Sequence, residues 1–286
     1  MNTPISRLKA IIQNFRALYR YPPGHFYSPL SDTKEVAKRK EETSVKGIDL
    51  RAASQKELLE KFVVYYQEQP FSHSQNNQFR YTFSNPFFCE SDGLMLYAML
   101  RHLNPVNVVE IGSGYSSAVM LDTAENYNLS TKFTFVEPYP ERLYSVIKES
   151  DKEKTEILEK GVQNIDFNKF KNLKENDILF IDSSHVAKYE SDVNYLFFEV
   201  LPTLNKGVVI HIHDIFFPFD YPYEWIKRGR AWNEGYLLKA FLQFNSVFQI
   251  ELFNDYIIHK EKNWVSENMS ICLQNTGGSI WLRKVQ

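Results

Sequence analysis

One run of the sequence constrains the fold of this chain more than any other feature. It reads Val108-Val109-Glu110-Ile111-Gly112-Ser113-Gly114-Tyr115-Ser116-Ser117. Its apolar half is typical of a buried strand, because a strand covered on both faces carries a continuous apolar run. Glycines between a strand and a helix let a ligand approach the backbone N–H groups where the helix begins. The run therefore predicts a strand, a turn and a helix that bind a ligand in an α/β fold.

The rest of the chain alternates between apolar runs and helical patterns. We expect helices from Ser54 and over 91–103, 140–150, 193–200 and 233–244, and strands over 106–111, 132–137, 155–158, 177–182 and 207–213. Such alternation indicates a parallel sheet with helices on both faces. Two final strands, 247–253 and 279–283, are expected to pair as an antiparallel edge. The predicted fold class is α/β, a Rossmann-like doubly wound, mainly parallel sheet with an antiparallel edge strand and an N-terminal helical extension.

The first fifty residues look like an arm rather than part of a core. Pro22, Pro23, Gly24 and Pro29 interrupt any helix there. The helical pattern that begins at Ser54 is expected to pack against the main domain. We therefore divide the chain into an N-terminal arm with a helical cap, 1–90, and a cofactor-binding domain, 91–286.

Composition excludes several classes of protein. A chain of 286 residues that is 43% hydrophobic and 24% charged is globular rather than disordered. Its formal net charge of -2 gives no overall field for nucleic acid or anionic lipid. No apolar run reaches the roughly 18–20 residues of a membrane span, and two cysteines, Cys89 and Cys272, allow no disulfide framework or four-thiolate zinc site. We expect a cytoplasmic protein that binds neither nucleic acid nor a membrane.

Polar side chains follow the first three predicted strands. Glu110 ends the first strand, where a carboxylate can accept a hydrogen bond from an ammonium group. Glu137 ends the second, where a carboxylate can take the two hydroxyls of a ribose, and Asn164, after the third, can present its amide to an adenine edge. Together with the turn Gly112-Ser113-Gly114 they outline a site for a nucleoside with a charged amino-acid tail. The alternative is that the glycines only shape a tight turn.

These residues resemble the class I S-adenosylmethionine-dependent methyltransferases over about 92–253. In that comparison Glu110-x-Gly112-x-Gly114 is the first motif and Glu137 is the ribose acid. A narrower resemblance is to a bacterial family of type 24 methyltransferases, carried by the runs Phe180-Ile181-Asp182-Ser183-Ser184-His185, Asp192-Val193-Asn194-Tyr195-Leu196, His211-Ile212-His213-Asp214-Ile215 and Gly24-His25-Phe26-Tyr27-Ser28-Pro29. The resemblance implies the fold and S-adenosylmethionine, but no particular acceptor.

Two carboxylates follow the fourth and fifth predicted strands. Asp182 and Asp214 are expected to meet at the edge of the sheet that holds the cofactor, and converging carboxylates suit Mg²⁺. In the catechol-type O-methyltransferases, which the chain resembles in part, an aspartate after the fourth strand and an acidic-amide pair after the fifth hold Mg²⁺. Here Ile215 follows Asp214, so His213 would replace the third ligand. The alternative is that Asp182 caps a strand end or supports the ribose, and that His213 is a satisfied core histidine.

One histidine lies where a base would be needed. His185 follows Asp182 by three residues and precedes the next helix. An imidazole with an ordinary pKa of about 6.5 suits the removal of a proton from an attacking hydroxyl. We therefore predict His185 as the catalytic base, with Asp182 also in the catalytic set. The alternative is that His185 caps a helix or holds Asp182 in place.

An aromatic run from Phe216 to Trp225 follows the fifth strand. We interpret it as a wall or lid over the acceptor pocket, with packing on the body or on a second subunit as the alternative. Arg228 and Arg230 come next and suit a carboxylate or phosphate on the acceptor, or else are solvated surface residues. By resemblance, His25 and Tyr27 in the arm are candidates for closing the site.

Three functions are compatible with these residues. The first is an S-adenosylmethionine-dependent methyltransferase that acts on a small-molecule or saccharide acceptor, at oxygen, either alone or as a homodimer. The second is a nicotinamide-dependent oxidoreductase. Against it, Ser117 stands where a dinucleotide fold prefers glycine or alanine, and no Tyr-x-x-x-Lys pair lies between the fourth and fifth predicted strands. The third is an inactive module that retains the nucleoside pocket.

Overall fold

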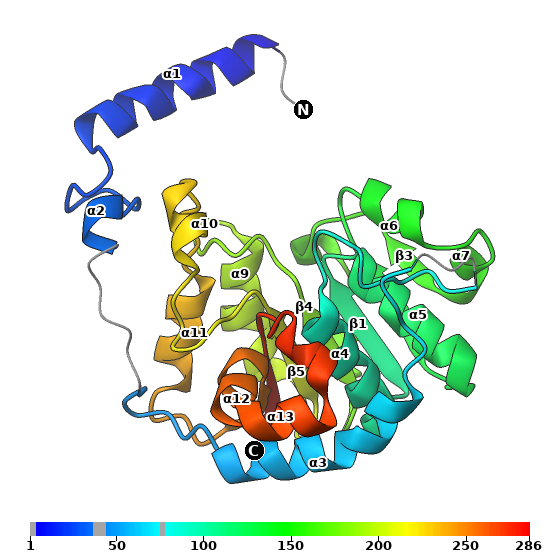
Figure 1. Ribbon diagram of the computed structural model, residues 1–286. Helices are drawn as coiled ribbons and strands as arrows, with labels where there is room; N and C mark the ends of the chain where they lie inside the picture. Colours follow the sequence, from blue (N-terminus) through cyan, green and yellow to red (C-terminus); the bar gives the residue numbers. More distant parts are fainter. Residues whose placement is uncertain (1–3, 37–43, 75–77) are drawn as a thin grey trace.

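The computed structural model describes residues 4–36, 44–74 and 78–286 (Figure 1). Within these residues the strands form one sheet in the order β3-β2-β1-β4-β5-β7-β6. Their bounds are β1 Asn107–Ile111, β2 Lys132–Val136, β3 Glu156–Leu158, β4 Ile178–Ile181, β5 Val209–His213, β6 Phe248–Phe253 and β7 Ser279–Lys284. Neighbours from β3 to β5 pair in parallel, and β7 is antiparallel to both β5 and β6. The predicted fold class is confirmed. The edge strand is β6, and the antiparallel strand β7 lies between β6 and β5.

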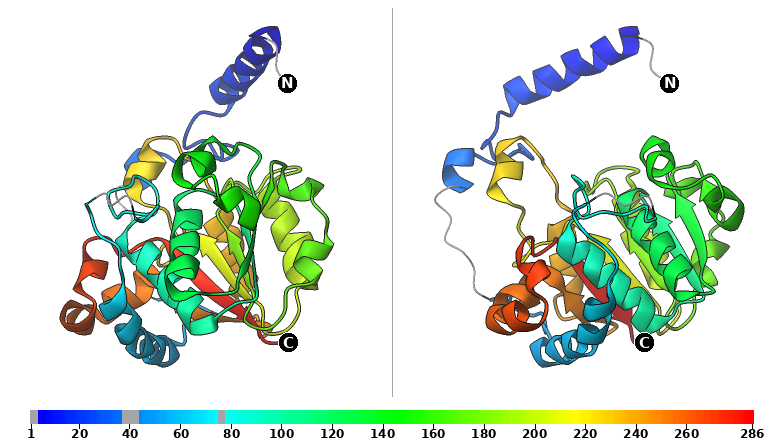
Figure 2. Two further views of the ribbon diagram at one scale, coloured as in Figure 1. Left: turned by 90° about the vertical axis from the view of Figure 1, so that its right-hand side faces the viewer. Right: turned by 45° about the vertical axis from the view of Figure 1, so that its right-hand side comes forward.

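Helices cover both faces of this sheet (Figures 1 and 2). Their bounds are α1 Pro4–Arg20, α2 Thr33–Val36, α3 Ala52–Glu68, α4 Glu90–Leu103, α5 Tyr115–Tyr127, α6 Glu141–Val146, α7 Asp151–Lys154, α8 Asn168–Lys171, α9 Asp192–Tyr195, α10 Tyr223–Lys227, α11 Glu234–Leu242, α12 Asn254–Lys260 and α13 Lys262–Asn268. A π turn over Leu196–Val200 continues α9. Across the described residues, no helix combines the length and the apolar character that crossing a bilayer requires.

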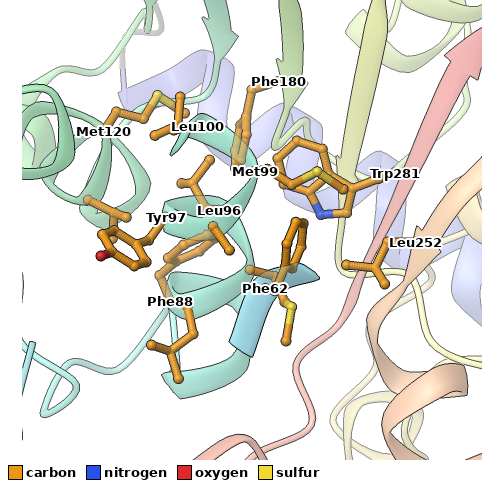
Figure 3. Packing of buried hydrophobic residues seen from close by; sticks show 14 of the residues in the cluster. Phe62, Phe88, Leu96, Tyr97, Met99, Leu100, Met120, Phe180, Leu252 and Trp281 are labelled. Carbon is orange, nitrogen blue, oxygen red and sulfur yellow. The ribbon is translucent and has the colours of Figure 1, made fainter. Parts of the chain in front are cut away.

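The strands divide the core into two clusters because successive side chains point to opposite faces. Val108 and Phe180 belong to one cluster, whereas their neighbours Val109 and Leu179 belong to the other. Figure 3 shows the first cluster, in which Phe180 of β4 meets aromatic and aliphatic side chains from α3, α4, α5, β6 and β7. Burial on both faces explains why the strands could be recognised as continuous apolar runs.

The N-terminal part of the chain differs in detail from what we expected. Residues 4–20 form the helix α1, which ends before the prolines at 22 and 23, whereas the sequence pattern indicated an irregular arm. The next long helix, α3, begins at Ala52 rather than Ser54. Leu59 and Phe62 of α3 are fully buried in the first core cluster. Phe88, which precedes α4, is buried in the same cluster. The division of the chain at residue 90 stays a prediction.

The carboxyl ends of four strands meet at one edge of the sheet. Ile111 pairs with Val136 of β2 and with Ile181 of β4, and Ile181 pairs with Ile212 of β5. The residues that follow these strands are therefore neighbours. Asp182 N–H, for example, donates to the Ile111 carbonyl at 2.8 Å. This edge gathers the residues that the sequence marked as functional.

Candidate active site

The glycine turn after β1 is pressed against the end of β4. Gly112 has a φ of 80°, and a Cβ atom there would lie 1.9 Å from the carbonyl oxygen of Asp182. Only glycine fits this position, because an L side chain would be strained by the backbone and blocked by the neighbouring strand. Gly112 N–H donates to the Val136 carbonyl at 3.0 Å. The turn thus joins β1, β2 and β4 at the edge where α5 begins.

Glu110 lies behind this turn and is fully buried. Ser116 Oγ donates to its Oε1 at 2.6 Å, and the Ser117 hydroxyl donates to its Oε2. Ser117 Oγ also accepts a hydrogen bond from Gly114 N–H at 3.0 Å. Burial raises the pKa of Glu110 to about 8, although the serine hydroxyls favour its charged form. Glu110 thereby fixes the start of α5, and its predicted contact with an ammonium group stays a prediction.

Glu137 follows β2 and is partly exposed beside the glycine turn. Its Oε2 accepts from Ser113 N–H at 3.2 Å, and its Oε1 accepts from Tyr139 N–H at 2.8 Å. Burial raises the pKa of this carboxyl above its ordinary value. The two backbone donors fix the carboxylate so that its free lone pairs can reach a ligand. Asn164 lies in a short 3₁₀ turn after β3, is exposed and does not line the same cleft.

A cleft of about 620 Å³ opens at this edge of the sheet. The predicted site residues that line it are Gly112, Ser113, Gly114, Glu137, Asp182, His185, His213 and Asp214. Phe87, Arg142 and Trp232 also line it and were not predicted as site residues. Phe87 is notable because it belongs to the part of the chain that we assigned to the N-terminal cap. The Arg142 guanidinium lies 4.0 Å from the centre of its ring.

His185 lies on the floor of the cleft among three carboxylates. Its Nδ1 is 2.9 Å from Glu234 Oε2, and its Nε2 is 3.3 Å from Asp182 Oδ1 and 3.5 Å from Asp214 Oδ2. Glu234 is fully buried at the start of α11, where its Oε1 also accepts from Ser183 Oγ at 2.9 Å. The His185 carbonyl in turn accepts from Glu234 N–H at 3.2 Å. The loop after β4 and the start of α11 therefore hold the imidazole between them.

These carboxylates dominate the electrostatics of the cleft. Burial alone would lower the pKa of His185, but the hydrogen bonds with Asp182 and Glu234 raise that pKa well above its ordinary value. The pKa of Asp182 is lowered, because the charges of His213 and His185 outweigh its burial. Burial raises the pKa of Asp214 in spite of the same two histidines. Both ring nitrogens of His185 thus face carboxylate oxygens, Nδ1 that of Glu234 and Nε2 those of Asp182 and Asp214.

Among the residues that the structure describes, the side chains grouped so that they could hold a metal ion are those of Asp182, His185 and Asp214. Their ligand atoms all lie within 4.8 Å of one another. This set differs from the predicted one, in which His213 was the third ligand. His213 is buried in the wall of the cleft, with its Nε2 3.7 Å from Asp214 Oδ1 and its ring 5.2 Å from that of Phe88. The structure therefore groups His185, rather than His213, with the two aspartates.

The aromatic run after β5 mostly packs on the body of the protein. Phe219 is buried in the second core cluster, and Phe217 contacts Phe253 and Tyr256. Of the run from Phe216 to Trp225, only Trp225 lines the cleft. The alternative, packing on the body, holds for Phe217 and Phe219, which lie beside β6 and α12. Phe216 and Tyr221 instead contact Trp225 and Trp232.

Trp225 instead forms one wall together with residues from the following loop. The Arg230 guanidinium lies 4.3 Å from the centre of the Trp225 ring and 4.5 Å from that of Trp232. The Trp232 ring lies 4.2 Å from the imidazole of His185. Arg228 lines the same side of the cleft and is exposed, as is Arg230. The Trp232 ring therefore lies between the candidate base, His185, and the solvent, and Arg228 and Arg230 stand beside it.

The candidates from the arm lie outside this cleft. His25 and Tyr27 line neither its floor nor its walls, and Tyr27 is 68% exposed. A separate hollow of about 130 Å³ lies between Pro23 and Pro29 of the arm and the segment from Ile226 to Trp232. The arm thus reaches the outer side of the Trp232 wall, and closure of the site by His25 or Tyr27 stays a prediction.

The chain is similar to several known proteins. Residues 109–215 match a family described as a methyltransferase domain. An uncharacterized protein of Archaeoglobus fulgidus is 34% identical over 168 residues, which are 55% of this chain and 76% of that protein. Two similar solved structures are the methyltransferase PaMTH1 of Podospora anserina bound to S-adenosylhomocysteine (15% identity, 91% of this chain and 99% of that one, TM-score 0.46) and the O-methyltransferase TomG of Streptomyces achromogenes bound to S-adenosylmethionine (14% identity, 80% and 90%, TM-score 0.44).

Proposed function

The chain belongs to the S-adenosylmethionine-dependent methyltransferases, and on that premise we propose that it moves a methyl group to a hydroxyl oxygen of a small-molecule or saccharide acceptor. One observation carries the proposal. The cleft brings a bare glycine turn and the carboxylate of Glu137 to one end, and the cluster of Asp182, His185 and Asp214 to the other. A cofactor at the first end would present its reactive group to an acceptor at the second.

The first end suits a nucleoside with an amino-acid tail. S-adenosylmethionine supplies a sulfonium methyl group that an acceptor oxygen can displace. Gly112 and Gly114 leave the backbone of the turn without side chains, so that a ligand can approach it closely. Glu137 is held by two backbone donors and can accept from both hydroxyls of a ribose. We assign the support of the amino-acid end to Glu110, acting through the turn that it fixes. The adenine contact of Asn164, which lies outside the cleft, stays a prediction.

His185 is the residue that we assign as base. Its Nε2 lies beside Asp182 and Asp214 at the floor of the cleft, and its Nδ1 is held by Glu234. A carboxylate behind an imidazole sets the orientation of the ring and stabilises it when it receives a proton. Methyl transfer by direct displacement depends mainly on alignment and on exclusion of water. Trp232, against the imidazole ring, contributes to both.

Asp182 and Asp214 are the residues that we assign to a divalent cation, Mg²⁺. Two carboxylates that converge on one point, with space for oxygen atoms of a substrate, are the ligands that this ion prefers. When bound, Mg²⁺ would orient an acceptor hydroxyl and lower its pKa. Asp214 has a φ of 56°, a conformation that aspartate and asparagine tolerate better than most residues. His213 supports this end of the cleft from within its wall.

The wall of the cleft indicates the chemistry of the acceptor. Trp225 and Trp232, packed with the Arg230 guanidinium, give the wall an aromatic side against which a sugar or another flat molecule can pack. Arg228 and Arg230 stand at the same wall and suit a carboxylate or phosphate group. We therefore expect an acceptor that combines a ring with a negative charge.

Ligand-induced stabilisation tests the cofactor assignment. Thermal unfolding would be followed with S-adenosylmethionine, S-adenosylhomocysteine and NAD, because a ligand at 100 times its dissociation constant adds about 2.7 kcal/mol of stability. We expect a shift with the sulfur nucleosides and none with NAD. Glu137→Ala should abolish the shift, whereas Glu141→Ala, at an exposed position of α6, should retain it. The absence of a shift in the wild type with either sulfur nucleoside would exclude the proposed function.

Methyl transfer tests the reacting end. Labelled S-adenosylmethionine would be incubated with a cell extract, and label incorporated by the wild type would be compared with that by His185→Ala and Asp214→Asn. Both variants should bind S-adenosylhomocysteine normally and transfer little label. Equal turnover by His185→Ala would show that His185 is not the base. Turnover that a chelator leaves unchanged would remove the assignment of Mg²⁺.

A further inference from the structure

The helix α1 stands apart from the rest of the molecule. Figures 1 and 2 show it clear of the sheet and its covering helices, beyond α2 and α10. None of its described residues belongs to either core cluster. Its 17 residues would span about 25 Å at the usual helical rise. Neither packing nor the cleft therefore explains why this segment is helical.

One face of α1 is apolar and uncovered. Leu8, Ile11, Ile12, Phe15 and Tyr19 follow the spacing of three and four residues that brings side chains to one side of a helix. Their exposed fractions are 58, 62, 46, 69 and 84%. A continuous stripe of large apolar residues is rarely left in water, and it indicates a surface that binds something.

The charges of α1 indicate what that surface binds. Four of the 33 basic residues of the chain lie in this helix, and none of its 35 acidic residues does. Lys9, Arg16 and Arg20 are exposed, and their spacing of seven and four residues places them along one edge of the apolar stripe. Long cationic side chains at such an edge can bury their methylene groups while their charges reach an anionic layer.

Aromatic residues continue the pattern just beyond the helix. Phe26 is 81% exposed and Tyr27 is 68% exposed, and their rings pack against each other and against His25. The Arg20 guanidinium lies 5.4 Å from the centre of the Tyr21 ring. Tyrosine is enriched at the boundary between lipid and water, because its ring is apolar and its hydroxyl is polar.

We propose that α1 lies in the plane of an anionic lipid bilayer, with its apolar stripe among the acyl chains and its cations at the headgroups. A second copy of the chain is the less suitable occupant. Two copies of the chain would have to match charges of opposite sign across their contact, whereas α1 offers cations alone. The proposal replaces our expectation of no membrane partner. That expectation rested on the total charge and on the absence of a spanning segment, and neither property describes a helix that lies on the surface.

Binding of the full chain to lipid vesicles tests this proposal. The protein would be sedimented with vesicles of phosphatidylcholine alone, and with vesicles that also contain phosphatidylglycerol. We expect partitioning at least about tenfold stronger onto the anionic vesicles, because each basic residue near an anionic surface adds attraction. Raising the salt concentration should weaken this binding, because salt screens exposed charges.

Two matched variants separate the apolar face from the rest of the helix. Ile11→Ser with Phe15→Ser removes two side chains of the stripe and should abolish sedimentation with vesicles. Gln13→Ser with Asn14→Ser changes two exposed polar residues outside the stripe and should leave it unchanged. Stabilisation by S-adenosylhomocysteine should be equal in both variants and the wild type, because α1 does not line the cleft. This control separates a failure of the proposal from a failure of the cofactor assignment.

Three outcomes would overturn the proposal. The first is that the wild type sediments equally with and without anionic vesicles. The second is that the variant Ile11→Ser with Phe15→Ser binds these vesicles as strongly as the wild type. The third outcome is a stable dimer, measured by light scattering, that the same substitution dissociates. That result would assign the stripe to a second copy of the chain instead of a bilayer.

Discussion

The two ends of the cleft are built in different ways. At the end beneath β1 and β2, the buried carboxylate of Glu110 meets partners from a nearby segment: it accepts from serines six and seven residues further along the chain. At the end beneath β4 and β5, His185 meets Glu234 from 49 residues away and Asp214 from another strand. The first end is completed locally, whereas the second depends on the assembly of the whole domain.

The electrostatic balance of the two ends also differs. Hydroxyls and backbone N–H groups donate to the carboxylates at the first end and so hold them in position. At the second end three carboxylates surround one imidazole, and His213 Nδ1 is buried without a hydrogen-bond partner among the described residues. Buried groups with strongly shifted pKa values cluster where chemistry is performed. From this comparison we propose that the first end binds and the second reacts.

The largest expected effect concerns the turn that joins the two ends. Gly112→Ala should lower the free energy of unfolding by more than about 3 kcal/mol, because it combines left-handed strain with a clash against β4. Urea denaturation measures this loss. Gly229→Ala is the matched control, since Gly229 also has a φ of 80° but no atom within 4 Å of an added Cβ. The control should lose only about 1–2 kcal/mol, and equal losses would show that contact with β4 contributes nothing.

The next effect isolates the second end. Glu234→Gln keeps the shape of the side chain but removes the charge behind His185, and should lower kcat for methyl transfer by about 10–100-fold. Stabilisation by S-adenosylhomocysteine should remain, because Glu234 does not line the cleft. Glu199→Gln, at an exposed position, serves as the control. A loss of cofactor binding together with kcat would contradict the separation of the two ends.

The sequence predicted the first end of the cleft better than the second, because the residues of the first end lie close together in the chain. Strand, glycine turn and helix are adjacent in the chain, so Glu110, Gly112 and Gly114 could be recognised together and Glu137 placed one strand away. The role of Glu234 could not be recognised, because nothing in its spacing links it to His185. His213 was predicted as a ligand from its position before Asp214. It lines the same cleft, but the ligand atoms that lie closest together are those of His185 and the two aspartates.

The periphery was harder still to predict. The prolines at 22 and 23 marked the end of a helix, α1, rather than the absence of one. The polar stretch after β6 folds as α12 and α13, which are held by apolar contacts of Ile257, Ile258 and Val265 with the core. Both α12 and α13 are stabilised by a few side chains that pack against parts of the core distant in the sequence. Local composition does not predict such packing.

A smaller effect tests how the first end is buried. The pKa of Glu110 is raised from 4.5 to about 8, so the folded protein binds more protons than the unfolded chain between these values. Stability supplied by the protonated form is therefore lost as the pH rises through this window. Relative to Glu110→Gln, the unfolding free energy of the wild type should fall by up to about 1.4 kcal/mol per pH unit. Urea titrations from pH 5 to pH 8 measure this slope. If the unfolding free energies of the wild type and Glu110→Gln changed equally with pH, the pKa of Glu110 would not be raised by burial.

The smallest expected effect concerns the wall above the second end. Arg230→Gln removes the cation between Trp225 and Trp232, and should raise the apparent KM for the acceptor by about 3–10-fold. Arg230 is exposed and packs on the rings of Trp225 and Trp232 rather than on His185 or the glycine turn. We therefore expect no change in kcat. Dilution of a methyl-accepting extract gives the apparent KM, and Lys227→Gln, which does not line the cleft, is the control. A fall in kcat at constant KM would place Arg230 with the reacting residues and not with those that recognise the acceptor.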